Sequence, residues 1–263
     1  MTDRYAVFGH PVSHSLSPQI HALFAAQTGQ DLRYEAICPP LDGFVPAVMA
    51  FIAAGGRGAN VTVPFKLEAF ALANKITPRA AAAGAVNTLS FNDAEIHGDN
   101  TDGAGLVRDL TVNLGFSLAG RRVLLLGAGG AARGVIRPLL EQNPATLRIA
   151  NRTPDKAQQL ADAFGVSGGG FDALANQTFD LVINATSAGL SDAVLPAPAF
   201  SADALAYEMV YGRETPFMRT ARMAGARVAD GLGMLVEQAA EAFSIWRGVR
   251  PQTAPVLTAL RSA

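Results

Sequence analysis

A glycine-rich turn between an apolar strand and a helix constrains the fold more than any other segment of the sequence. From Val123 the chain reads Val-Leu-Leu-Leu-Gly-Ala-Gly-Gly-Ala-Ala, which fits the pattern Gly-x-Gly-x-x-Ala. Gly127 permits a tight turn, Gly129 lets the backbone approach a pyrophosphate, and Ala132 is small enough for close packing of the helix on the strand. The free N–H groups at the helix start favour phosphate. The segment predicts a dinucleotide-binding unit, although a plain tight turn would also use these residues.

The residues around this turn alternate between apolar strands and helical patterns. A strand–helix–strand–helix–strand order predicts a parallel sheet with helices on its faces. The expected strands cover residues 122–126, 146–151 and 180–184, and the expected helices cover residues 130–142 and 154–164. Residues 167–170, a short Gly/Ser cluster, are expected to form a loop.

The N-terminal part carries a second set of short elements. Ser17 is expected to cap a helix that ends at Gly29, and Asp42 is expected to cap the next helix. Further expected elements are strands at residues 4–9, 32–38 and 59–63, a hairpin at 89–97, and helices after residues 64 and 78 and at 231–248 and 253–260. The sequence therefore predicts an α/β protein of two domains. A substrate-binding domain would comprise residues 1–101 plus 238–263, and a Rossmann-type doubly wound domain residues 102–237, with the cleft between them.

Composition excludes several classes of protein. The 263 residues carry 21 Lys and Arg against 22 Asp and Glu, so no domain-wide positive field is available to bind nucleic acid or an anionic membrane. The single cysteine, Cys38, excludes an intramolecular disulfide and a cysteine-cluster metal site, and the four histidines form no zinc pattern. No apolar run reaches the roughly 18 residues of a membrane span, and the N-terminus lacks a signal-peptide pattern. We expect a soluble, cytoplasmic protein without a metal.

The end of the second strand of the nucleotide unit indicates which dinucleotide binds. Units that bind NAD usually place Asp or Glu there, about 20 residues after the glycines, to accept the ribose 2′-hydroxyl. This chain has Asn151-Arg152-Thr153 instead, and Lys156 follows. Because a guanidinium fork suits a phosphate dianion, we prefer NADP(H) to the alternative of a solvated basic turn. Residues 184–189, small and polar, are expected near the nicotinamide or in an ordinary loop.

Polar residues also interrupt the apolar segments of the N-terminal part. Ser15 and Ser17 stand at a helix entrance, where hydroxyls and N–H groups can hold a carboxylate. Asn60 and Thr62 share one face of a strand end, because they are two residues apart. Lys66, one of only three lysines, comes next.

Lys66 has two interpretations. It is a surface lysine at a helix start, or it forms an acid–base pair with Asp102, which otherwise caps its own helix. Asn87-Thr88 and Asn100-Thr101 add two amide-and-hydroxyl clusters beside these residues.

Eight short blocks along nearly the whole chain resemble those of shikimate dehydrogenases, in the same order. Four lie in the N-terminal part: GHPVSHSLSP from Gly9, GANVTVPFK from Gly58, GAVNT from Gly84 and GDNTDGAG from Gly98. The other four are residues 127–134, 151–153, 184–190 and 231–238. Each block alone is modest, and their joint occurrence is specific. The Asn-Arg-Thr turn is more similar to the NADP-dependent branch than to the NAD-using quinate/shikimate branch.

The resemblance implies roles for individual residues. Lys66 and Asp102 would be the catalytic pair. The substrate carboxylate would be held by Ser15, Ser17, Thr62 and Tyr211, and the other substrate-binding residues would be Asn60, Asn87 and Gln238. The coenzyme would be bound by Gly127, Ala128, Gly129, Gly130, Ala131, Asn151, Arg152, Thr153, Lys156, Thr186, Ser187, Met209, Gly231 and Met234. The chain departs from the family pattern at Ala22, Glu208 and Gly212. Because of the last two departures, the resemblance does not predict the shape of the loop near Tyr211.

The reaction implied by the resemblance is the reversible reduction of 3-dehydroshikimate by NADPH to shikimate, a step of aromatic amino acid (chorismate) biosynthesis, by a monomer or homodimer. Three alternatives remain. They are a broader quinate/shikimate dehydrogenase, a non-catalytic NADP-binding regulator, and another two-domain reductase such as a folate or amino-acid dehydrogenase. Retention of Lys66 and Asp102 argues against a regulator. The Ser15/Ser17 cluster is not explained by the last alternative.

Overall fold

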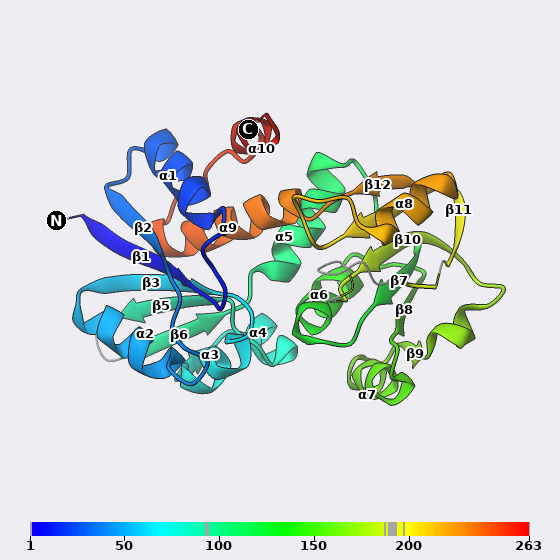
Figure 1. The fold of residues 1–263 in the computed structure, drawn as a ribbon, viewed down its shortest axis with the longest axis horizontal. Coiled ribbons are helices and arrows are strands. Elements are labelled where there is room, and N and C mark those ends of the chain that lie inside the picture. The colour runs from blue at the N-terminus through cyan, green and yellow to red at the C-terminus, as the bar shows by residue number, and fades with distance from the viewer. Residues whose placement is uncertain (1, 93–94, 187, 189–193, 197, 263) are drawn as a thin grey trace. The chain divides into compact units, whose positions relative to one another are not determined.

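The computed structural model describes residues 2–92, 95–186, 188, 194–196 and 198–262 (Figure 1). The chain forms two units, which are described separately. Unit 1 comprises residues 1–106 and 235–263, and unit 2 comprises residues 107–234. The boundaries fall inside two helices, α5 (Asp102–Arg108) and α9 (Leu232–Arg247). No helix in the described part of the chain is long and apolar enough to cross a membrane.

Unit 1 contains a mixed six-stranded sheet in the order β2-β1-β3-β5-β6-β4. Strand β1 is parallel to both β2 and β3, and β5 is antiparallel to both β3 and β6, which confirms the expected hairpin. The strands are β1 (Asp3–Phe8), β2 (Leu32–Ile37), β3 (Gly56–Val61), β4 (Lys75–Ile76), β5 (Thr88–Asn92) and β6 (Glu95–Asp99). The helices besides α5 and α9 are α1 (Ser17–Thr28), α2 (Phe44–Ala53), α3 (Lys66–Leu72), α4 (Pro78–Ala83) and α10 (Ala254–Arg261).

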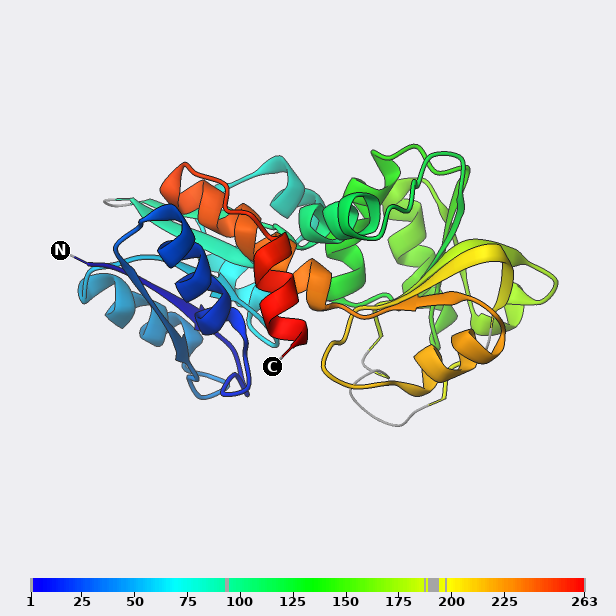
Figure 2. The same ribbon diagram turned by 90° about the horizontal axis from the view of Figure 1, so that it is seen from above.

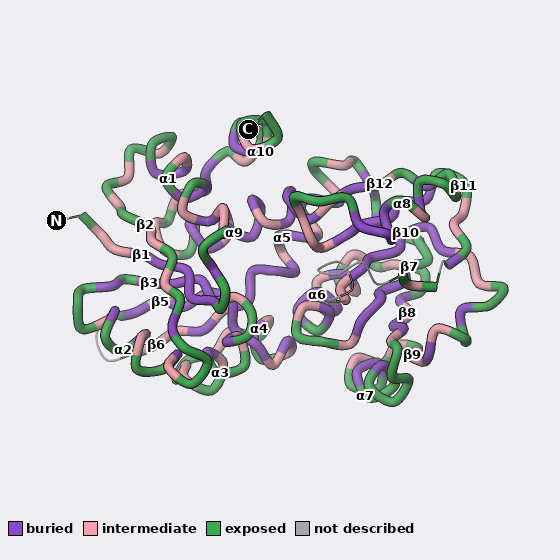
Figure 3. Tube along the Cα trace, viewed as in Figure 1, coloured by how far each residue is buried: buried purple, intermediate pink, exposed green. Residues whose placement is uncertain are grey.

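Alternate residues of each strand point to opposite faces of the sheet. Helices cover both faces and pack against these side chains. Ala6 and Phe8 of β1 pack with Phe44 and Phe51 of α2 in one apolar cluster. A second cluster joins α1, α9 and α10, which lie side by side in Figure 2. Within the sheet, β1 and β3 are mostly buried, whereas the edge strand β2 is half-buried or exposed (Figure 3).

Unit 2 contains an all-parallel six-stranded sheet in the order β9-β8-β7-β10-β11-β12. In chain order this is 3-2-1-4-5-6, the order of a Rossmann dinucleotide-binding unit, so the predicted fold class is confirmed. The strands are β7 (Arg122–Leu126), β8 (Thr146–Ala150), β9 (Ser167–Gly169), β10 (Thr178–Asn184), β11 (Ala199–Glu208) and β12 (Arg227–Ala229). The helical segments are the π-helix η1 (Asp109–Asn113), α6 (Gly130–Leu140), α7 (Pro154–Phe164), the 3₁₀ segment η2 (Phe171–Leu174) and α8 (Pro216–Met223).

Three local expectations are wrong. Ser17 does not cap α1; Leu16 is the N-cap, Ser17 is already helical, and its N–H donates to the Ser15 hydroxyl at 3.3 Å. The N-cap of α2 is Gly43 rather than Asp42. Residues 167–170 are not simply a loop, because they include β9.

Gly168 of β9 has a packing role. A Cβ at Gly168 would lie 2.5 Å from the carbonyl oxygen of Ala157 in α7, so strand and helix approach too closely for any side chain. Glycine is selected here for close contact, which composition alone does not distinguish from a loop.

Candidate functional site

The two residues predicted as a catalytic pair are in contact in unit 1. Lys66 is the first residue of α3, and Asp102 is the first residue of α5. The Lys66 Nζ atom lies 2.6 Å from Asp102 Oδ2, and the two side chains are 20% and 9% exposed. An ammonium and a carboxylate at this distance form a charge-assisted hydrogen bond, and shielding from water strengthens it. The bond uses one of the three ammonium hydrogens and leaves two for other acceptors.

Asn87 holds the other oxygen of this carboxylate. Its amide nitrogen lies 2.7 Å from Asp102 Oδ1, 3.0 Å from Thr101 Oγ1 and 3.3 Å from Gln238 Oε1. Its oxygen accepts the Thr101 N–H at 2.8 Å, which fixes the orientation of the amide. The Gln238 amide nitrogen donates in turn to the carbonyl of Leu235 at 2.8 Å. Asn87, which precedes β5, Thr101, which precedes α5, and Gln238 of α9 therefore orient Asp102 jointly.

Asn60 lies behind Asn87. Its amide nitrogen donates to the carbonyl of Asn87 at 3.2 Å and to the Thr88 hydroxyl at 3.1 Å. Its oxygen accepts the Tyr34 hydroxyl at 2.8 Å. Both amide hydrogens of Asn60 are therefore used inside unit 1, where Asn60 fixes Asn87 and Thr88 at the start of β5. Tyr34 was not among the predicted site residues, because a tyrosine in a strand carries no local signal of its partner.

The predicted carboxylate-binding residues of unit 1 lie at one edge of its sheet. Ser15 and Ser17 follow the carboxyl end of β1, and Thr62 follows the carboxyl end of its parallel neighbour β3. The Thr62 N–H donates to the carbonyl of Phe8 at 2.8 Å, which joins the two strand ends. A Cβ at Gly9 would lie 2.4 Å from the Thr62 methyl, so Gly9 leaves the space that Thr62 occupies. Tyr211 belongs to unit 2.

The glycine-rich turn of unit 2 has the geometry that a pyrophosphate needs. Gly127 has a φ of 110°, which favours glycine, and the N-cap of α6 is Gly129. A Cβ at Gly129 or Gly130 would meet no atom within 4 Å, so the space in front of the helix N-terminus is open. Ala132 is fully buried, as close packing of helix on strand requires. These residues fit the phosphates of a dinucleotide.

The predicted 2′-phosphate site follows β8. Arg152, Thr153 and Lys156 are exposed at the start of α7, and the Thr153 side chain does not cap this helix. The Asn151 amide donates to the carbonyl of Thr153 at 3.0 Å and fixes the turn. Arg152 makes no hydrogen bond or ion pair with any residue that the structure describes, so its guanidinium is available to an anion.

The remaining predicted coenzyme residues lie at the ends of β10 and β11 or near α9. Thr186 donates its hydroxyl to Asn184 at 2.7 Å. A Cβ at Gly231 would lie 2.1 Å from the carbonyl oxygen of Met209, so these two backbones are in direct contact. The Met234 N–H donates to a buried tyrosine hydroxyl of β11 at 3.3 Å. Ser187 lies outside the described residues.

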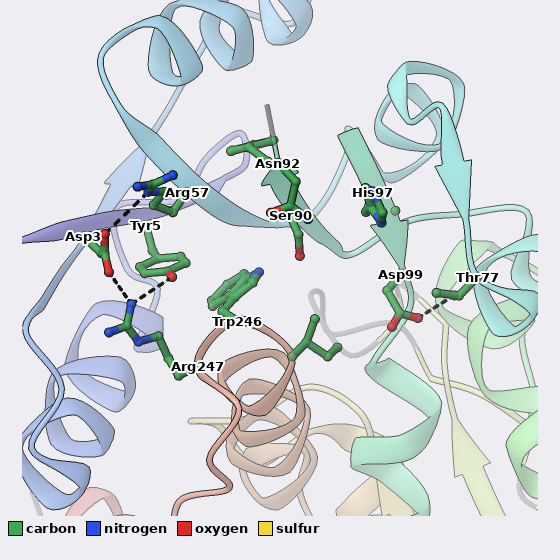
Figure 4. Close-up of a pocket in the computed structure, with 13 residues that line it drawn as sticks. Asp3, Tyr5, Arg57, Thr77, Ser90, Asn92, His97, Asp99, Trp246 and Arg247 are labelled. Atoms are coloured by element: carbon green, nitrogen blue, oxygen red, sulfur yellow. Dashed lines mark hydrogen bonds and ion pairs between the residues drawn. The ribbon is translucent and has the colours of Figure 1, made fainter. Parts of the chain in front are cut away.

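Unit 1 also contains a cavity of about 410 Å³, drawn in Figure 4. Trp246 stacks on Tyr5 with ring centroids 4.7 Å apart, and Arg247 donates to Asp3 beside them. None of the predicted catalytic or substrate-binding residues lines this cavity, and its aspartates are already paired with arginines.

The fold and these two sites define a class: a two-unit α/β protein with a Rossmann unit for a dinucleotide and a polar acid–base site on a separate unit. Comparison with known proteins specifies the family. Three family models match the chain: the shikimate dehydrogenase substrate binding domain over residues 7–89, shikimate/quinate 5-dehydrogenase over residues 110–194, and the shikimate 5′-dehydrogenase C-terminal domain over residues 231–261.

Curated and solved relatives agree with these matches. The chain is 65% identical to a shikimate dehydrogenase (NADP(+)) of Methylobacillus flagellatus, over 99% of this chain and all of the relative. It is 63% identical to a shikimate dehydrogenase (NADP(+)) of Dechloromonas aromatica, over 100% of this chain and 98% of the relative. A shikimate 5-dehydrogenase of Thermus thermophilus, solved with NADP(H) and shikimate, shares the fold with a TM-score of 0.90 and 37% identity over 99% of each chain. This chain belongs to the shikimate dehydrogenase family.

Proposed function

We propose that Lys66 and Asp102 catalyse the reversible reduction of 3-dehydroshikimate by NADPH to shikimate. Membership of the family makes the chain an NADP-dependent oxidoreductase that acts on a CH–OH group, in the shikimate pathway. The observation that carries the proposed roles is the contact of 2.6 Å between Lys66 Nζ and Asp102 Oδ2, held by Asn87.

In the reduction, bound NADPH supplies a hydride to the C3 carbonyl carbon of the substrate. The electron pair of the carbonyl π bond then moves to oxygen, where negative charge develops. The Lys66 ammonium stabilises this charge and donates a proton to the oxygen, so the carbonyl becomes a hydroxyl. Asp102 holds the ammonium in position through Oδ2. In the reverse direction Lys66 takes the proton from the hydroxyl.

The other polar residues of unit 1 would orient the substrate. Ser15, Ser17 and Thr62 supply hydroxyls for its carboxylate, and we assign Tyr211 of unit 2 to the same group. Asn87 and Gln238 would meet the ring hydroxyls, while Asn60 supports Asn87 from behind. Hydrogen bonds to substrate hydroxyls give strong discrimination, because an analogue that lacks one leaves buried protein groups unpaired.

In unit 2 the open turn at Gly129 and Gly130 would hold the pyrophosphate, and Arg152 with Lys156 would hold the 2′-phosphate. The absence of a carboxylate at the end of β8 supports NADP(H) over NAD(H).

The test of this function is turnover of purified protein with shikimate and NADP+, followed through the absorbance of NADPH, beside parallel assays with quinate and with NAD+. We expect fast turnover only with shikimate and NADP+. Comparable rates with quinate or NAD+ would place the chain in a broader quinate/shikimate branch. No turnover with any pair, in protein that binds NADPH, would favour a binding-only regulator.

Lysine variants test the assigned catalyst. Lys66→Ala should lose most of kcat and keep the fold, whereas Lys75→Ala should be active as wild type, because Lys75 is an exposed lysine that pairs with Glu95. Wild-type turnover in Lys66→Ala would refute the assignment. We expect a cytoplasmic monomer or homodimer, which light scattering and cell fractionation can establish.

A further inference from the structure

Glu208 is a fully buried carboxylate at the carboxyl end of β11. No ion pair reaches it among the residues that the structure describes. It accepts three hydrogen bonds instead: from the Asn184 amide at 2.8 Å, from the Thr215 hydroxyl at 2.9 Å and from the Val210 N–H at 3.2 Å. Burial raises the pKa of this carboxyl above its usual value, and the three donors oppose that rise. Burial of a carboxylate without an opposite charge costs free energy, and the three converging donors offset part of that cost.

These three donors belong to three different segments. Asn184 ends β10, and its oxygen accepts both the N–H and the hydroxyl of Thr186, at 3.1 Å and 2.7 Å. Val210 lies in the loop after β11, and Thr215 is the N-cap of α8. Glu208 therefore joins residues 185–186, which begin the loop after β10, to the loop after β11 and the start of α8.

Both loops contact the segments that would surround a bound coenzyme. A Cβ at Gly127, in the glycine-rich turn, would lie 3.0 Å from the carbonyl oxygen of Ala185 in the first loop. In the second loop, the Val210 carbonyl accepts the N–H of Gly231 at 3.1 Å. In a Rossmann unit ligands bind at the carboxyl ends of the strands, and the second half of the sheet binds the second mononucleotide. Here that half begins with β10 and β11, so the two loops lie on the nicotinamide side.

We propose that Glu208 is a positioning residue for the nicotinamide half of the coenzyme: its carboxylate sets residues 185–186 after β10 and the loop after β11, and through them the geometry of hydride transfer. The proposal rests on the proposed function, because it requires an NADP(H) site in unit 2. It assigns Glu208 no contact with the reacting atoms.

The hydrogen-bond pattern requires a carboxylate rather than an amide. All three partners donate, and two of them share Oε2. In Glu208→Gln, whichever way the amide is turned, its NH₂ group faces at least one donor. Asn184 cannot turn to compensate, because its oxygen already accepts both bonds from Thr186. Glu208→Asp keeps the charge but shortens the reach by about 1.5 Å, one C–C bond.

The experiment compares Glu208→Gln and Glu208→Asp with wild type and with Glu214→Gln. Glu214 is the matched control, because it is an exposed carboxylate a few residues further on that pairs with Arg222. Three quantities are measured: kcat and KM with shikimate and NADP+, the Kd of NADP+ by calorimetry, and the Kd of adenosine 2′,5′-bisphosphate, which has the adenosine half but no nicotinamide.

For Glu208→Gln we expect kcat to fall and the Kd of NADP+ to rise. The product of the two changes should be about 10- to 100-fold, since a misplacement of the order of 1 Å can cost that much. The Kd of adenosine 2′,5′-bisphosphate should not change. Glu208→Asp should lie between Glu208→Gln and wild type, and Glu214→Gln should match wild type.

A general destabilisation has a different signature. It would lower the melting temperature and weaken both ligands equally, and that result would overturn the proposal, as would wild-type kcat and Kd in Glu208→Gln. If Glu208→Gln does not fold, the same comparison with Glu208→Asp decides. Failure of the proposed function can be distinguished from failure of this proposal. If the proposed function is wrong, wild type shows no turnover with shikimate, and the two Kd values still test the role of Glu208.

Discussion

Replacement of Asp102 by Asn tests the site most directly, because the carboxylate and the amide have nearly the same shape. Asp102 accepts from Lys66 through one oxygen at 2.6 Å and from Asn87 through the other at 2.7 Å. In Asp102→Asn the new NH₂ group must face one of these two donors. Asn87 cannot turn its amide to relieve the conflict, since its oxygen accepts the Thr101 N–H at 2.8 Å. One of the two bonds is therefore lost in either orientation.

The size of the effect follows from what is lost. Hydrogen bonds to charged groups contribute about 1.5–3 kcal/mol, and this carboxylate is only 9% exposed, so solvent compensates little. A loss of about 2–3 kcal/mol in transition-state stabilisation corresponds to about 30- to 160-fold in kcat/KM. The larger part should appear in kcat, because the charge that Lys66 stabilises develops only in the transition state.

The assay is steady-state turnover with shikimate and NADP+, together with calorimetric binding of NADP+ and thermal unfolding. NADP+ affinity should not change, because the glycine-rich turn belongs to unit 2 and Asp102 to unit 1. The double variant Lys66→Ala, Asp102→Asn should be scarcely worse than Lys66→Ala alone, because the two residues act as a pair. Wild-type kcat/KM in Asp102→Asn, or fully additive losses in the double variant, would refute the reasoning.

Three further predictions concern other parts of the chain. Arg152→Ala should weaken NADP+ by about 10- to 100-fold and leave NAD+ unaffected, as the loss of a charge-assisted bond to the 2′-phosphate implies; equal effects on both coenzymes in a binding titration would contradict this. Gly231→Ala places a Cβ 2.1 Å from the Met209 carbonyl oxygen, so the backbones must separate, at a cost of about 1–3 kcal/mol that thermal unfolding should detect. His21 is fully buried, and burial lowers its pKa from 6.5 to about 3, so the unfolded chain binds more protons between these values and wild type loses stability as the pH falls from 6.5 towards 3. His21→Phe should remove about 2 kcal/mol of that loss at pH 5, measured by urea unfolding through the fluorescence of Trp246, the single tryptophan; equal pH dependence of the two proteins would contradict it.

The regular elements of unit 2 follow from local sequence. The expected bounds of β7 and α7 match the structure, because a run of buried Val and Leu and a proline at the helix start leave few alternatives. By contrast, β11 and β12 were not predicted. In β11 the buried residues come at its end, and its first five residues are exposed or half-buried, so neither an apolar run nor an alternation marks the strand from its start.

The residues of the site could be predicted from the sequence, but the hydrogen bonds between them could not. Lys66 and Asp102 could be paired from their types and from the family resemblance. The contact of Asn87 with Gln238 spans 151 positions, and that of Tyr34 with Asn60 spans 26. Such contacts depend on which strands become neighbours, and no local pattern encodes that. The resemblance marked Glu208 only as a departure, whereas its three donors are visible only in the folded chain.

The hydrogen-bond count at Asn87 indicates how the site accepts a substrate. The amide nitrogen carries two hydrogens but faces three acceptors, of which Gln238 Oε1 is the farthest at 3.3 Å. A substrate hydroxyl that replaces Gln238 at this nitrogen therefore costs the protein its weakest bond, while the shorter bonds to Asp102 and Thr101 persist. Gln238 then keeps two bonds, from its nitrogen to the carbonyl of Leu235 at 2.8 Å and from the Thr101 hydroxyl to its oxygen at 3.4 Å, and the second of these is long. If the proposed function holds, the network would keep Asp102 oriented towards Lys66 both before and after substrate binds, and the adjustment would fall on Gln238.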